Sequence, residues 1–89
     1  MKTVPASLGH VELRPLDQTR LEPHLTNWLK CHRYLMNLPM QDHHEVAKML
    51  VLELGGKCRL PIVDRLVSRY NRMRAIALHN EITECLNAK

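Results

Sequence analysis

Basic residues are concentrated in one stretch of this 89-residue chain, between Gly56 and Arg74. The stretch carries six basic residues and one acidic residue, a net charge of +5, whereas the whole chain has a net charge of +4. The six are Lys57, Arg59, Arg65, Arg69, Arg72 and Arg74. A guanidinium presents a planar fork of donors that suits phosphate oxygens. We therefore expect these residues to bind an anionic partner, and we favour nucleic acid as that partner.

Two other interpretations of the basic stretch remain open. A helix face that is merely solvated usually mixes acidic with basic residues at i, i+4 spacing, because like charges there are mildly destabilising. Arg65 and Arg69 have this spacing with no Glu between them. Solvation alone therefore explains why this face is polar, but not why its charge is positive. The stretch could instead dock on an acidic or nucleic-acid-binding surface of a larger complex, as an interaction or inhibitor module would.

The element that must position the arginines is a helix beginning at Pro61 and running to residue 80 or further. Pro is pre-set for the first helical position. At about 100° per residue, Arg65, Arg69 and Arg72 fall within about 60° of one another and form a stripe. An apolar seam is expected on nearly the opposite side, facing the core; it consists of Val63, Leu66, Tyr70, Met73 and Ala77.

A second helix is predicted over residues 42–54. Asp42 and Glu45 have the spacing of a capping box, in which each side chain accepts from the other residue's backbone amide. Apolar residues cover almost the whole circumference, which predicts a central, buried helix. Gly55 and Gly56 end it, one of them in the left-handed conformation. A buried helix, a turn and a basic helix resemble a helix-turn-helix arrangement in outline, but the turn is longer than usual, and we assign no family.

The remaining helix is predicted over residues 19–37, with Pro23 in its first turn and one apolar face that includes Trp28, Leu29 and Met36. Residues 1–16 carry Pro5, Gly9 and Pro15, so we expect a flexible or extended arm there. The sequence therefore predicts an all-α protein: three helices in a single domain spanning residues 17–89, preceded by a short arm.

Other chemistry finds little support in the sequence. The six histidines and three cysteines lack the paired spacing of a structural zinc site, so we expect no metal, no cofactor and no enzymatic activity. Three widely spaced cysteines suit a reducing compartment, and we expect all of them to be buried and the protein to be cytoplasmic. No apolar run is long enough for a membrane span. Apolar residues on the last turns, Ile76, Ile82 and Leu86, add a homodimer through the third helix as a further hypothesis.

Overall fold

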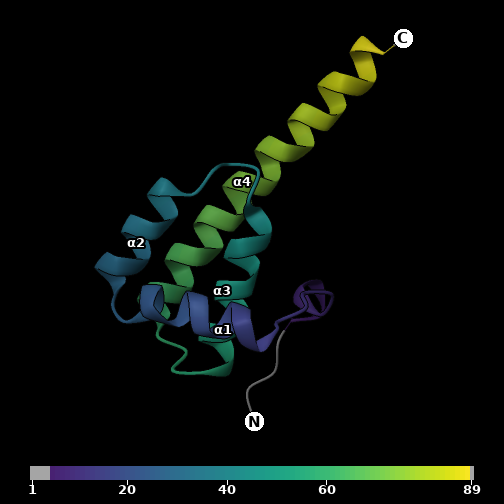
Figure 1. Cartoon of the computed structure of the whole chain (residues 1–89). Helices are drawn as coiled ribbons and strands as arrows, with labels where there is room; N and C mark the ends of the chain where they lie inside the picture. The colour runs from purple at the N-terminus through teal and green to yellow at the C-terminus, as the bar shows by residue number, and fades with distance from the viewer. Residues whose placement is uncertain (1–4, 89) are drawn as a thin grey trace.

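The computed structural model describes residues 5–88, and within that range it is all-helical with no strand. Four α-helices and two short 3-10 helices follow one another in the order η1 (Ala6–Leu8), α1 (Pro15–Leu21), η2 (Glu22–Leu25), α2 (Trp28–Asn37), α3 (His43–Gly55) and α4 (Leu60–Asn87). Helices α2 and α3 pack against the first half of α4, and the second half of α4 extends away from the bundle (Figure 1). The predicted all-α class is confirmed, but the predicted three helices are four.

The range predicted as an arm contains helical structure. Its first four residues lie outside the described residues. In η1, Leu8 is only 5% exposed and belongs to the core. Helix α1 then begins at Pro15, and the carboxylate of Asp17 accepts a hydrogen bond from the backbone N–H of Arg14 at 3.3 Å. A proline in the first turn and a side chain that accepts from a free backbone amide are typical of a helix start. Pro15 was predicted to lie in the arm.

The prediction of one continuous helix over residues 19–37 was wrong, because α1, η2 and α2 divide that range between them. Asn27 has an extended backbone (φ −150°, ψ 171°), and its side-chain oxygen accepts from the Lys30 amide at 2.9 Å. Asn27 therefore begins a new helix, and the residues of α2 that face the core differ from those expected for one continuous helix. Trp28 and Leu29, predicted to face the core, are consequently 43% and 49% exposed.

Helix α3 lies where the sequence predicts a central helix, but the predicted capping box does not form. Asp42 is the N-cap residue and makes no side-chain cap hydrogen bond. Glu45 turns instead toward α1, where its carboxylate accepts from Arg20 at 2.7 Å. A tertiary ion pair thus replaces the local contact that the spacing predicted.

The left-handed residue of the α3–α4 turn is Cys58, with φ 50°, and neither Gly55 nor Gly56 has a positive φ. The Cys58 amide donates to the carbonyl of Glu53 at 2.8 Å, which closes the end of α3. Cys58 and Cys85 are exposed, so the prediction that every cysteine is buried holds only for Cys31. Burial raises the pKa of the Cys31 thiol to about 11.

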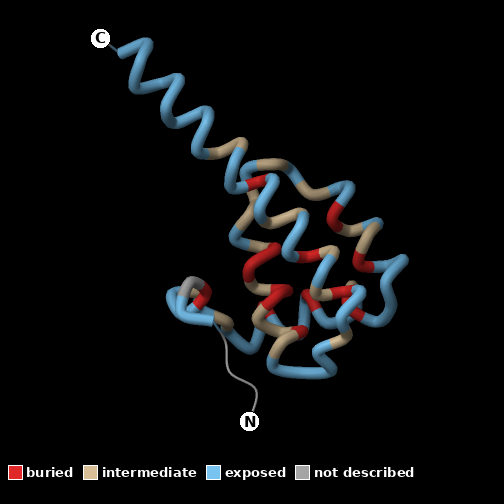
Figure 2. Tube along the Cα trace, turned by 180° about the vertical axis from the view of Figure 1, so that it is seen from behind, coloured by how far each residue is buried: buried red, intermediate tan, exposed pale blue. Residues whose placement is uncertain are grey.

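The core lies among α1, η2, α2, α3 and the first half of α4 (Figure 2). The side chains with the least exposure are Leu21, Leu35, Met49, Leu66, Met73, Val46 and Cys31. They come from all four α-helices, and the buried hydrophobic residues are aliphatic or sulfur-containing, as the aromatic-poor composition requires. Leu50, on the central helix, is 4% exposed.

Helix α4 contains 28 residues, about 42 Å at 1.5 Å per residue. It begins one residue before Pro61 and runs to Asn87, in agreement with the prediction of a helix to residue 80 or further. Its buried residues are Ile62, Leu66 and Met73, and every described residue from Leu78 onward is exposed. The second half of α4 therefore makes no contribution to the core of its own chain.

Candidate nucleic-acid interface

Of the six basic residues singled out in the sequence, Arg59 is the one most engaged within the fold. Its guanidinium pairs with the Glu53 carboxylate at 2.9 Å and also donates to the carbonyl oxygens of Thr26, at 3.0 Å, and Leu25. The Glu53 side chain is 2% exposed. Burial raises the pKa of Glu53, but the hydrogen bonds from Arg59 outweigh burial and leave the pKa below its usual value. Arg59 ties the α3–α4 turn to η2 and acts as a structural residue.

Arg65 lies where α2 meets α4. Its Nε donates to His32 Nδ1 at 3.0 Å, and a terminal nitrogen contacts Met36 Sδ at 3.6 Å. The Trp28 indole stacks on the His32 ring with centroids 4.8 Å apart and planes 8° from parallel. The half-buried guanidinium is thus held against an aromatic pair on the neighbouring helix.

Arg69 lies closer to the core than the sequence analysis predicted. It is seven residues after Ile62, three after Leu66 and four before Met73, spacings that place it on the same side of α4 as these buried residues. The arginine stripe therefore borders the buried face, and the prediction that the two lie nearly opposite was wrong. The Nε atom of Arg69 is buried and has no hydrogen-bond partner among residues 5–88.

Arg72 and Arg74 are both exposed, on different sides of α4. Two residues apart, they point about 160° away from each other. Arg74 donates to the Tyr70 hydroxyl at 3.2 Å and its guanidinium lies 5.8 Å from the Tyr70 ring centre. Lys57 is exposed in the α3–α4 turn. The six residues are therefore not a single patch: Arg65, Arg69 and Arg72 share one side of α4, while Lys57, Arg59 and Arg74 lie elsewhere.

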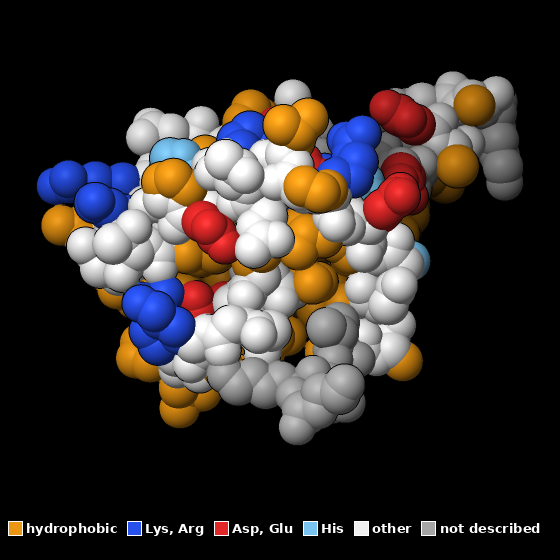
Figure 3. Space-filling model, turned by 60° about the horizontal axis from the view of Figure 1, so that its bottom comes forward, with side chains coloured by type: hydrophobic (Ala, Val, Ile, Leu, Met, Phe, Trp, Pro, Cys, Tyr) orange, Lys and Arg blue, Asp and Glu red, His pale blue; other side chains and the backbone are white. Residues whose placement is uncertain are grey.

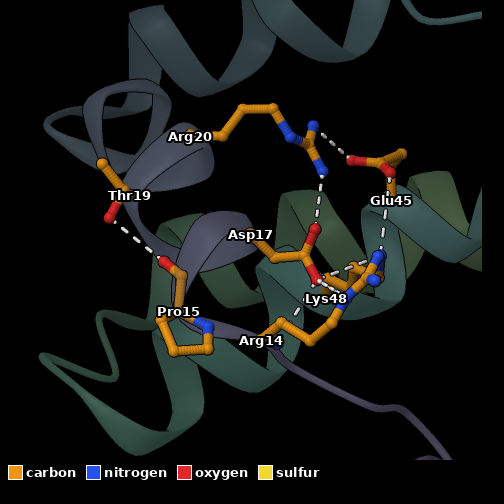
Figure 4. A network of polar contacts seen from close by, with 7 residues as sticks. All are labelled: Arg14, Pro15, Asp17, Thr19, Arg20, Glu45 and Lys48. Atoms are coloured by element: carbon orange, nitrogen blue, oxygen red, sulfur yellow. Dashed lines mark hydrogen bonds and ion pairs between the residues drawn. The ribbon is translucent and has the colours of Figure 1, made fainter.

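The acidic side chains that form ion pairs lie on α1 and α3. Asp17 is 5% exposed and pairs with Arg14, Arg20 and Lys48. Burial raises the pKa of Asp17, but the Arg14 amide, Arg20 and Lys48 together outweigh burial and lower the pKa to about 2. Glu45, on α3, pairs with two of these cations, Arg20 and Lys48 (Figure 4). This network fastens α1 to α3 and gives each of its three cations a carboxylate partner.

Arg65, Arg69 and Arg72, by contrast, form no ion pair with a carboxylate of the described chain. On the face turned forward in Figure 3, basic side chains stand in separate groups with acidic and hydrophobic ones between them. Among residues 5–88, Lys57 and Arg74 also lack a carboxylate partner, but each stands alone, whereas Arg65, Arg69 and Arg72 lie together on the side of α4 that adjoins α2. We call this surface the α2–α4 face and define it by Trp28, His32, Met36, Arg65, Arg69 and Arg72.

Sequence reasoning missed the contribution of α2 to this face. Trp28, His32 and Met36 recur every four residues, a spacing that places them on one side of a helix. Within Trp28–Asn37 there are two basic residues, Lys30 and Arg33, and no acidic one. That charge bias was readable in the sequence, whereas the contact with Arg65 required the fold.

No protein-family model, no curated protein and no solved structure significantly matches this chain.

Residues 5–88 contain no group of three His, Cys, Asp or Glu side chains arranged to hold a metal ion. Within the same range, no helix is both long enough and apolar enough to cross a lipid bilayer.

His43 and His44 lie side by side with ring centres 4.3 Å apart, and burial together with the neighbouring His44 lowers the pKa of His43.

Proposed function

We propose that this chain is a non-enzymatic nucleic-acid-binding module that contacts phosphates through Arg65, Arg69 and Arg72. The observation that carries the proposal is the separation of charge. Arg14, Arg20, Lys48 and Arg59 each pair with a carboxylate. Lys57 and Arg74 form no ion pair among residues 5–88 either, but they stand apart from one another, whereas Arg65, Arg69 and Arg72 gather on one side of α4. The three arginines of the α2–α4 face form no ion pair within the same range, so an external anion is the simplest partner for them.

Phosphate suits the chemistry of this face. Guanidinium groups bind phosphate through two parallel N–H donors, and such contacts set affinity without reading base identity. The exposed Trp28 ring, supported from one side by His32, adds a surface on which an unpaired base can stack. Binding should therefore be largely independent of sequence and should extend to single strands.

A second candidate function is docking on an acidic protein surface, and one specific observation favours it. Trp28, Leu29 and Met36 are 43%, 49% and 56% exposed beside the arginines. Protein interfaces are enriched in Trp, Met and Arg, and their central contacts are apolar. A protein partner would use the hydrophobic half of the α2–α4 face, which phosphate contacts would leave exposed.

Replacement of Arg65, Arg69 and Arg72 together by Gln tests the first function. The change keeps helix propensity and removes three charges. We expect circular dichroism to show an intact fold and fluorescence anisotropy to show weaker binding to duplex DNA and single-stranded RNA. On duplex DNA, the slope of log affinity against log salt should become shallower by up to ~0.9 per lost phosphate contact.

A matched pair of single variants distinguishes binding at the α2–α4 face from attraction by the net charge of the chain. Arg72→Gln and Arg14→Gln each remove one exposed arginine, but only Arg72 belongs to the α2–α4 face. Arg72→Gln should weaken binding, and Arg14→Gln should leave it nearly unchanged. Equal losses would show attraction by net charge alone and would contradict the assigned site.

The protein-docking function makes a different forecast. Trp28→Ala and Met36→Ala would then abolish capture of a partner from nuclease-treated lysate, and the unmodified chain would not bind naked nucleic acid.

We also propose the cytoplasm as the compartment, because reducing conditions would keep the exposed thiols of Cys58 and Cys85 free.

A further inference from the structure

The projecting half of α4 carries an apolar surface that is exposed among residues 5–88. Leu78, Ile82 and Leu86 are 57%, 51% and 66% exposed and follow one another at four-residue spacing. With Cys85 and Glu81 they line a shallow hollow along the helix. Figures 1 and 2 show this part of α4 standing clear of the bundle.

The first half of α4 borders an apolar groove on the same side of the helix. The groove has a volume of about 290 Å³ and is lined by Pro5, Leu8, Leu50, Leu54, Val63, Val67, Tyr70 and Asn71. Val67 and Asn71 are eleven and seven residues before Leu78, so all three point within about 20° of one direction. Groove and exposed leucines therefore form a continuous strip along one side of α4.

Charge divides the same helix into two halves. Four arginines lie between Arg65 and Arg74, whereas residues 75–88 contain Glu81 and Glu84 and no Lys or Arg. Of these charged residues, Arg74 and Glu81 point nearest to the strip, about 40° and 60° from Leu78 around the helix axis. Two copies of α4 laid side by side in opposite directions would therefore bring Glu81 of each toward Arg74 of the other. A parallel arrangement would place like charges together.

We propose that two copies of this chain associate through antiparallel α4 helices, with the two-fold axis near Ala77 and Leu78. The projecting part of each helix would lie along the groove of the other, with Leu86 between the second copy's Val67 and Asn71. Leu86 is eight residues, about 12 Å, beyond Leu78, and the groove residues Asn71 and Val67 lie about 10 and 16 Å before it at 1.5 Å per residue, so the exposed end reaches the groove. Glu81 would then face the second copy's Arg74.

This surface is distinct from the α2–α4 face. Arg65, Arg69 and Arg72 point about 120° to 180° away from Leu78 around the helix axis. The dimer would therefore leave these arginines accessible and present two copies of them. The association does not depend on what the arginines bind.

Sedimentation equilibrium of the chain tests the association. We expect a concentration-dependent dimer, and we expect Leu78→Glu combined with Ile82→Glu to be monomeric with unchanged helical content. Leu16→Glu is the control, because Leu16 is 83% exposed on α1, away from the strip. It should dimerise like the parent. A parent that stays monomeric up to ~1 mM would overturn the proposal.

The orientation has a test of its own. Glu81→Arg places like charges at both Glu81–Arg74 contacts of a dimer, and so does Arg74→Glu, so each variant alone should dimerise more weakly than the parent. An equimolar mixture restores two opposite-charge contacts, so the heterodimer should form with an affinity near that of the parent. A mixture no tighter than either variant alone would rule out the antiparallel register.

Discussion

Replacing Arg59 by Met should destabilise the fold more than removal of any arginine from the α2–α4 face. Met retains much of the aliphatic stem but leaves the Glu53 carboxylate, 2% exposed, without its guanidinium partner. The carbonyl oxygens of Leu25 and Thr26 lose their donors as well. Removing one partner of a buried ion pair costs ~3 to 5 kcal/mol. Stability of ~0.05 to 0.15 kcal/mol per residue implies a total of ~4 to 13 kcal/mol for 89 residues.

Urea and thermal unfolding followed by circular dichroism measure this effect. The thermal midpoint should fall by about 12 °C or more, because each kcal/mol shifts a domain of this size by about 4 to 8 °C. The double variant Glu53→Met with Arg59→Met should recover most of the loss, since it leaves no unpaired buried charge. Arg72→Gln, at an exposed position, should stay within ~0.5 kcal/mol of the parent. A stable Arg59→Met, or a double variant no better than the single one, would refute the structural role of Arg59.

Three other predictions concern the helix ends and the α1–α3 network. The pKa of Asp17 is lowered from 3.8 to about 2, so its contribution to stability is present above about pH 4 and is lost as pH falls toward 2; Asp17→Asn should flatten that part of an acid titration followed by circular dichroism. Asn27→Ala should cost ~0.5 to 2 kcal/mol in urea melts by removing the acceptor for the Lys30 amide, whereas Asp42→Ala should cost less, and the reverse order would contradict the observed caps. Cys58→Gly should raise the thermal midpoint, because glycine accommodates φ 50° without the steric cost of a Cβ, and a lower midpoint would argue against this turn conformation.

Helices α3 and α4 were predictable because local signals agree along their length. Apolar residues surround α3, glycines follow it, and Pro61 stands in the first turn of α4. The range that became α1 and α2 carries the same apolar periodicity without an obvious break. Asn27 looks like one polar residue in a continuous pattern, and only its extended backbone identifies it as a cap. The restart changes which side of α2 is buried, and therefore exposes Trp28.

The residue types of the candidate site could be predicted from the sequence, but their arrangement in space could not. The excess of positive charge is a property of the sequence, but the role of each arginine depends on partners that the sequence does not place. Arg59 meets Glu53 across a turn, and Arg65 meets His32, 33 residues earlier in the chain. Such non-local contacts determine that Arg59 is structural and that Arg65 joins α2 at the surface.

The most direct test of the central claim is the affinity of the unmodified chain for nucleic acid at two salt concentrations. Duplex DNA and single-stranded RNA of unrelated sequences would be titrated at ~50 mM and ~200 mM salt by fluorescence anisotropy. Phosphate binding by three arginines predicts affinity at low salt that tolerates sequence changes and falls steeply at high salt, with a slope of up to about −2.7 on duplex DNA at ~0.9 per contact. A chain that binds neither ligand at ~50 mM salt, or whose affinity does not respond to salt, would contradict nucleic-acid binding and favour a protein partner for the α2–α4 face.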